Sequence, residues 1–188
     1  MKKILLPGLV GGIVYFLWSF ISHMATPIGQ MGISTVDANE DAVISTLKSN
    51  MQKPGFYMLP GAGMLGNPTA EQRAAVEAKY NAGPTAIVVY APTGAPMMSG
   101  GQLGRQFLFT LLSALIAAFI VSATAASLTT RAVMVALMGA FSWLMISLPQ
   151  WNWYRFPAAF VIGAGIDNIV GWLIAGFAIA WMIGRAEK

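Results

Sequence analysis

Asp167 is the residue whose type and position most favour chemistry, because it is an acid inside a long apolar segment. The only other charged residues between positions 106 and 184 are Arg131 and Arg155. An ionisable residue within a membrane-spanning helix is a candidate for proton, ion or substrate handling. It can equally be a hydrogen-bonded lock between helices or a contact to another subunit, and all three hypotheses stay open.

Tyr15 and Ser19 of the first apolar segment are the expected partners of Asp167. Asp167 lies about 15 Å along a helix from Pro157, given a rise of about 1.5 Å per residue, which places it near the middle of a bilayer. A helix that crosses in the opposite direction from the amino terminus brings Tyr15 and Ser19 to about the same depth. Their hydroxyl groups could donate hydrogen bonds to the carboxylate.

Small residues accompany both segments at helical spacing. On the Asp167 face, residues at four-residue steps are the helix-packing candidates Gly163, Gly171 and Ala175. Gly8 and Gly12 form a G-x-x-x-G pattern in the first segment, continued by Tyr15, Ser19 and Ser22. Because such residues let helix backbones approach closely, we expect Asp167 to face another helix of the protein.

Three residues are candidates for a site at the outer face of the membrane that the helices cross. His23 is the only histidine, and at the end of the first segment it could bind a ligand, titrate, or cap the helix. Arg105 and Arg155 border the same surface, where they either anchor lipid headgroups or form an anion site. The sequence does not choose between these interpretations.

Several functional classes find no support in the chain. It has no cysteine, and its twelve methionines follow no metal-binding repeat. The G-x-G-x-x-G pattern at 61–66 opens no helix directly, unlike a nucleotide-binding loop. The eleven basic residues are scattered rather than clustered for nucleic acid. We therefore expect no enzyme activity, no cofactor, no metal site and no nucleic-acid partner.

Four apolar segments must position the candidate residues. The chain is 56% hydrophobic and 10% charged, whereas a soluble domain has about 25% charged residues. A helix needs about 20 apolar residues to cross the hydrocarbon core. The expected fold is an α-helical integral membrane protein with four transmembrane helices. The first occupies residues 1–24, and the region 106–183 holds the others at 107–127, 132–148 and 158–183.

The distribution of basic residues predicts the orientation. One side of the membrane collects Lys2, Lys3, Arg131, Arg185 and Lys188, whereas the short loop on the other side has Arg155. Because basic residues favour the cytoplasmic side, both termini are expected to be cytoplasmic, including the tail 184–188. The segment 25–105 is then extracytoplasmic.

The insert 25–105 between the first two helices has the pattern of a small α/β unit. Asn39 is expected to cap a helix that reaches about residue 51, and 56–59 reads as a short strand. Thr69 and Gln72 have capping-box spacing and open a helix to about residue 80. The β-branched segment 86–90 then predicts a second strand. So small a unit is expected to pack against the membrane domain or a partner.

Three stretches carry a resemblance to other proteins. Residues 5–23 (LLPGLVGGIVYFLWSFISH), residues 151–154 (WNWY) and the pair Ile166-Asp167 resemble small four-helix bacterial inner-membrane proteins of uncharacterised function. The resemblance implies a multi-pass protein of the bacterial inner membrane. It also implies that His23 and Asp167 are positions to test, and it carries no activity across.

Two functions remain after these exclusions. The preferred hypothesis is a non-enzymatic accessory or assembly subunit of a larger membrane complex, with the lipid bilayer and other membrane subunits as partners. The alternative is a small ion- or proton-coupled transporter that uses Asp167. A membrane enzyme ranks third, because Asp167 has no partner nucleophile or metal set in the sequence.

Overall fold

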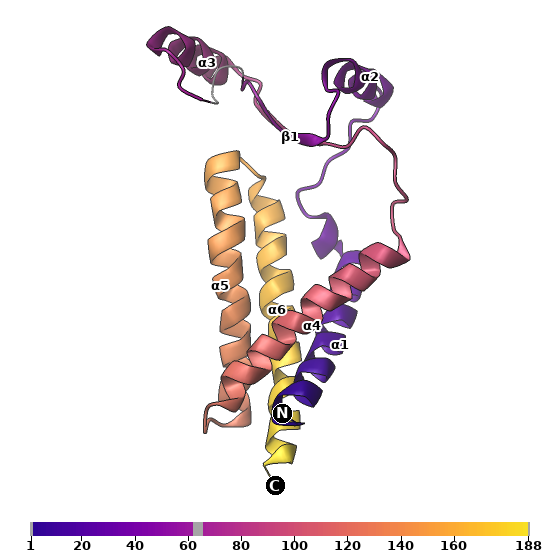
Figure 1. The fold of residues 1–188 in the computed structure, drawn as a ribbon, viewed down its shortest axis with the longest axis vertical. Coiled ribbons are helices and arrows are strands. Elements are labelled where there is room, and N and C mark those ends of the chain that lie inside the picture. The colour runs from indigo at the N-terminus through magenta and orange to yellow at the C-terminus, as the bar shows by residue number, and fades with distance from the viewer. Residues whose placement is uncertain (1, 62–65, 188) are drawn as a thin grey trace. The chain divides into compact units, whose positions relative to one another are not determined.

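The chain forms two units along its length. The computed structural model describes residues 2–61 and 66–187 (Figure 1). A helical unit comprises the residues up to Ser34 and those from Met98 onward, and a second unit comprises Thr35–Met97. The expected insert 25–105 is therefore longer than the observed second unit, because the residues on either side of it pack with the helices.

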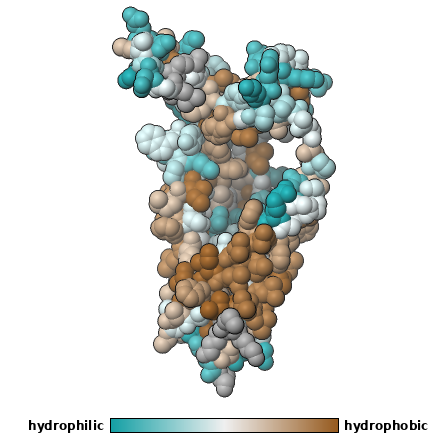
Figure 2. All heavy atoms as spheres, viewed as in Figure 1, coloured by the Kyte–Doolittle hydropathy of each residue, from teal (hydrophilic) through white to brown (hydrophobic). Residues whose placement is uncertain are grey.

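The helical unit contains four long helices and one short turn of 3-10 helix. In chain order its elements are α1 (Lys2–Met24), η1 (Pro27–Gln30), α4 (Gly100–Ser122), α5 (Leu128–Tyr154) and α6 (Ala158–Ala186). All four α-helices are long and apolar enough to cross a membrane, as the sequence predicts. Figure 2 shows hydrophobic side chains gathered over the surface of these helices. The helical unit is that of a multi-pass membrane protein.

Five ends of three helices differ from the expected ones, and local capping explains the starts of α4 and α5. α4 begins at Gly100 rather than 107 because Ser99 and Gln102 form a reciprocal capping box, with Gln102 N 3.2 Å from Ser99 Oγ. It also ends at Ser122, short of 127. α5 begins at Leu128, where Ser127 caps it, and continues to Tyr154 rather than 148. α6 continues past 183 to Ala186.

The helices pack unequally on one another. α5 and α6 lie side by side along their lengths, and α1 packs against both α4 and α6. α4 approaches α5 only near their short connection and leans away from it toward Gly100 (Figure 1). The buried apolar cluster lies where α4, α5 and α6 converge, and it consists of Ala114, Ala117, Ala118, Val121, Val135, Ile179 and Ile183.

The second unit has the predicted order of helix, strand, helix and strand. Its elements are α2 (Glu40–Asn50), β1 (Gly55–Leu59), α3 (Ala70–Ala82) and β2 (Ala86–Tyr90). The strands pair antiparallel, with Gly55 opposite Tyr90 and Leu59 opposite Ala86. The expected capping box of Thr69 and Gln72 is present.

Asn39 departs from its expected role in this unit. It occupies the N-cap position of α2, but its side chain makes no capping hydrogen bond. The backbone at Asn39 has φ −120° and ψ 18°, outside the extended conformation that normally aims a capping side chain at the first turn. Of the glycine-rich pattern at 61–66, residues 62–65 lie outside the described part of the chain.

Candidate functional site

Asp167 forms the centre of a buried polar cluster between α1 and α6. Its side chain is 9% exposed, and its Oδ1 accepts a 2.5 Å hydrogen bond from Ser22 Oγ. Ser22 is fully buried near the end of α1. No described residue donates to the second carboxylate oxygen, Oδ2. One oxygen therefore binds α1, and Asp167 also lines a pocket.

His23 extends the cluster toward the surface. Its Nδ1 lies 3.0 Å from Ser22 Oγ and 3.0 Å from the Ser19 carbonyl oxygen, while its side chain is exposed. When Nδ1 carries the proton, hydrogen bonds run from the imidazole through the Ser22 hydroxyl to Asp167. Serine is thus the middle member of the chain, whereas a nucleophilic triad places histidine between serine and acid. The arrangement suits hydrogen bonding and proton exchange rather than acyl transfer.

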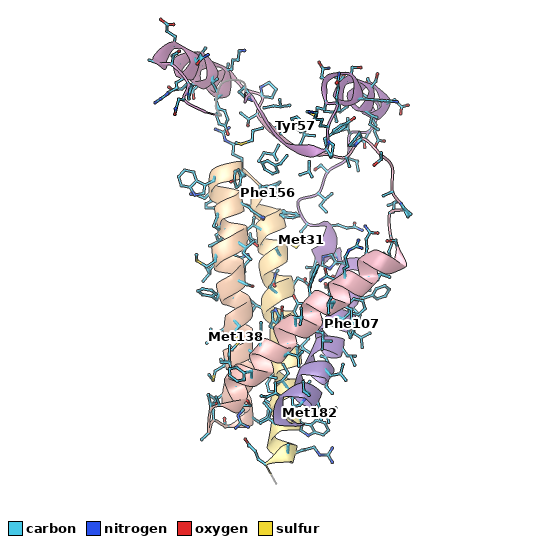
Figure 3. The ribbon with its side chains drawn as sticks, viewed as in Figure 1. Met31, Tyr57, Phe107, Met138, Phe156 and Met182 are labelled. Atoms are coloured by element: carbon cyan, nitrogen blue, oxygen red, sulfur yellow. The ribbon has the colours of Figure 1, made fainter. Side chains whose placement is uncertain are left out.

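A pocket of about 230 Å³ opens beside Asp167, and η1 forms one wall of it. The opposite wall is α6, and the lining residues are His23, Ile28, Gly29, Met31, Phe160, Gly163, Ala164, Asp167 and Asn168. Thr26 starts the turn by donating to the Ser22 carbonyl oxygen at 2.6 Å and accepting from Ile28 N at 3.2 Å. Met31 then lies against α6 (Figure 3).

Two glycines allow η1 to approach α6 this closely. A Cβ atom at Gly163 would lie 3.1 Å from the Ile28 carbonyl oxygen. Gly32 has a φ of 72°, in the left-handed region that favours glycine, and a Cβ atom there would clash with the backbone of Phe160. The segment after α1 therefore folds back over the first turns of α6 instead of leaving the bundle.

The partners of Asp167 differ from the expected ones by about one helical turn. Tyr15 donates instead to Asn168 Oδ1 at 3.3 Å, and Ser19 contributes only its carbonyl oxygen to the cluster. Ser22 lies about one turn after Ser19 and near the end of α1, and its hydroxyl contacts Asp167. The mid-bilayer position of Asp167 stays a prediction.

The small residues pack in a different combination from the expected one. Gly8 and Gly12 face α4, where added Cβ atoms would lie 2.9 Å from Leu115 Cα and 3.1 Å from Leu111 Cα. Gly171 lies against Tyr15 and Trp18 of α1. Gly163 contacts η1, and Ala175 is fully buried. α1 thus uses separate faces for α4 and α6.

A larger cavity of about 430 Å³ lies in the opening between α4 and α5. Its floor includes Tyr15 and Trp172, whose rings are 4.4 Å apart, and Met138 lies on its α5 side (Figure 3). Asn168 lines this cavity as well as the pocket beside Asp167. The sequence reasoning missed Asn168, although an amide next to Asp167 in an apolar segment was a visible signal.

The arginines do not join the Asp167 cluster. Arg105 and Arg155 are exposed, and neither lines the pocket. Arg131 is almost fully buried at the other end of α5, where it forms a two-pronged ion pair with Glu187 at 2.8 and 3.1 Å. It also donates to the Thr124 carbonyl oxygen. This pair fastens the end of α6 to the start of α5.

The described residues contain no group of histidine and acidic side chains suited to a metal ion. No protein-family model matches the chain, and neither a curated protein nor a solved structure is detectably similar to it.

Proposed function

We propose that the protein is a non-enzymatic accessory or assembly subunit of a larger membrane complex in a bacterial inner membrane. In this proposal both termini are cytoplasmic and residues 35–97 are extracytoplasmic, facing other subunits. The orientation is supported by Arg131 and Arg185 at one end of the helical unit, against Arg155 in the short loop at the other.

The observation that best supports this proposal is the small core of the second unit. Among its described residues Met51 is the only buried hydrophobic side chain, although the unit forms two helices and a sheet. Val89 on β2 is 78% exposed, and Val43 and Ile44 on α2 are exposed as well. A folded unit with so little buried apolar surface needs a further surface for stability. A neighbouring subunit supplies that surface.

Site-specific photo-crosslinking of the full chain in native membranes tests this proposal. A benzophenone amino acid is placed at Val89, and a matched control is placed at exposed Glu77 on α3. We expect irradiation to join Val89 to a second polypeptide and to leave Glu77 without an adduct. Crosslinks from Val89 only to lipid or to the chain's own helices would refute the proposal.

The second candidate, a small ion- or proton-coupled transporter, is favoured by one specific observation. Asp167 is linked through Ser22 to the exposed His23, so protons have a hydrogen-bonded route between the surface and a buried carboxylate. Asn168 continues the polar lining into the larger cavity. The variant Asp167→Asn distinguishes this transporter from the accessory subunit.

A further inference from the structure

We propose that the pocket between η1 and α6 binds a primary ammonium group, with Asp167 as its counter-ion. The pocket combines one buried carboxylate with apolar walls, and its volume is about 230 Å³. A single water needs only about 10–15 Å³ of such space, so an alkylammonium of several atoms fits. This site is independent of the proposed subunit role.

The charge of Asp167 favours a cationic ligand. Asp167 is about nine-tenths buried, and no lysine or arginine lines its pocket. The only basic side chain there is His23, which reaches the carboxylate through Ser22. Oδ2 has no donor from the described residues, and Asp167 lines the pocket. A buried carboxylate is stabilised in its charged form by a nearby cation, and the pocket beside Asp167 has room for one.

The lining selects an ammonium over a metal ion. Ca²⁺ takes about six to eight oxygen ligands, whereas the side chains here offer the Asp167 carboxylate and the Asn168 amide, whose oxygen already accepts from Tyr15. An ammonium group needs fewer acceptors, because it has only three N–H donors. Its alkyl part can pack on Ile28 and Met31, and Phe160 adds a further apolar side chain to the lining.

The position of the pocket suggests where the amine comes from. The pocket lies where α1 ends and α6 has just begun, close to the end of two membrane-spanning helices. A primary ammonium that reaches such a pocket belongs either to a small soluble amine or to a phosphatidylethanolamine headgroup. Both sources present the same primary ammonium, so one experiment with two arms distinguishes them.

Binding is measured on the full chain in phosphatidylcholine nanodiscs by calorimetric titration with ethylamine. Choline headgroups are quaternary and donate no N–H, so they leave the site vacant. We expect saturable binding that weakens at least tenfold in Asp167→Asn and is unchanged in Asp41→Asn, a control carboxylate on exposed α2. Equal binding by Asp167→Asn, or an equal loss in Asp41→Asn, would overturn the proposal.

The second arm repeats the titration in nanodiscs that contain phosphatidylethanolamine. Competition by this lipid identifies the headgroup as the natural source, and undiminished ethylamine binding identifies a soluble amine. If Asp167→Asn fails to fold, the wild-type protein still decides the question. Excess tetramethylammonium and sodium should then fail to displace ethylamine, whereas methylamine should displace it. Displacement by tetramethylammonium, or no saturable binding at all, contradicts an N–H-donating ligand.

Discussion

Replacing Asp167 separates the structural role of the carboxylate from any functional one. In Asp167→Asn the amide keeps the shape of the side chain and one oxygen that can accept from Ser22 Oγ. In Asp167→Leu that acceptor is lost. Ser22 is fully buried, so its hydroxyl cannot turn to solvent. It can still donate to the Ser19 carbonyl oxygen, which lies 3.1 Å away.

The expected magnitudes follow from these contacts. Hydrogen bonds between transmembrane helices contribute about 0.6 kcal/mol on average and up to about 1.7 kcal/mol. Burial and an acidic acceptor place the Ser22–Asp167 hydrogen bond in the upper part of that range, and the alternative acceptor on Ser19 lowers the cost of losing it. We expect Asp167→Leu to destabilise the helical unit by about 1 kcal/mol and Asp167→Asn by less than about 0.5 kcal/mol.

The assay is reversible unfolding of the purified chain in bicelles, with Ser22→Ala completing a double-mutant cycle. Ser22→Ala should cost about as much as Asp167→Leu, and the two losses should not add, because both remove one contact. Additive losses would show that the contact does not stabilise the protein. Protein level, partner co-purification and host growth are followed in parallel. An Asn variant that folds and assembles but is inactive would favour the transporter over the subunit.

Three further predictions address packing, charge and orientation. Gly8→Ala should destabilise the protein by about 1 kcal/mol, because the added Cβ would lie 2.9 Å from the backbone of α4. The control Gly104→Ala, in open space, should be neutral or stabilising. Equal stabilities of the two variants would contradict the α1–α4 contact. Glu187→Gln should lower stability by about 1 kcal/mol at low salt and by less at high salt. The reason is that Glu187 is 39% exposed to solvent, whereas its partner Arg131 is buried. A loss of stability that does not depend on salt would point to another cause. A reporter inserted near Asn67 should behave as exported and one fused to the carboxyl terminus as cytoplasmic, and the reverse pattern would remove the proposed orientation.

The helices and the second unit were predictable because their signals are local. Long apolar segments need a bilayer, whatever their partners, and Thr69 with Gln72 caps a helix through contacts three residues apart. The same logic, applied to Ser99 and Gln102, would have placed the start of α4 correctly. Helix ends in a membrane protein are therefore better read from capping residues than from where hydrophobicity begins.

Which helix packs on which face of its neighbour was not predictable from such local signals. A G-x-x-x-G pattern says that some helix approaches closely, but Gly8 and Gly12 carry no information on whether that helix is α4 or α6. The segment after α1 folds back onto α6 with a positive φ at Gly32. Such a turn is decided by tertiary packing against Phe160, which a single sequence does not reveal.

The two oxygens of Asp167 explain why one residue can support both a lock and a binding site. Oδ1 accepts from Ser22, whereas Oδ2 has no donor from the described residues, and Asp167 lines the pocket. An asparagine at this position has a single oxygen, and the buried Ser22 hydroxyl, as a donor, orients that oxygen toward itself. The amide NH₂ then takes the place of Oδ2, where it presents donors to an ammonium that needs acceptors. Asp167→Asn therefore preserves the lock and removes the site, so loss of amine binding without loss of stability assigns the two roles to separate atoms.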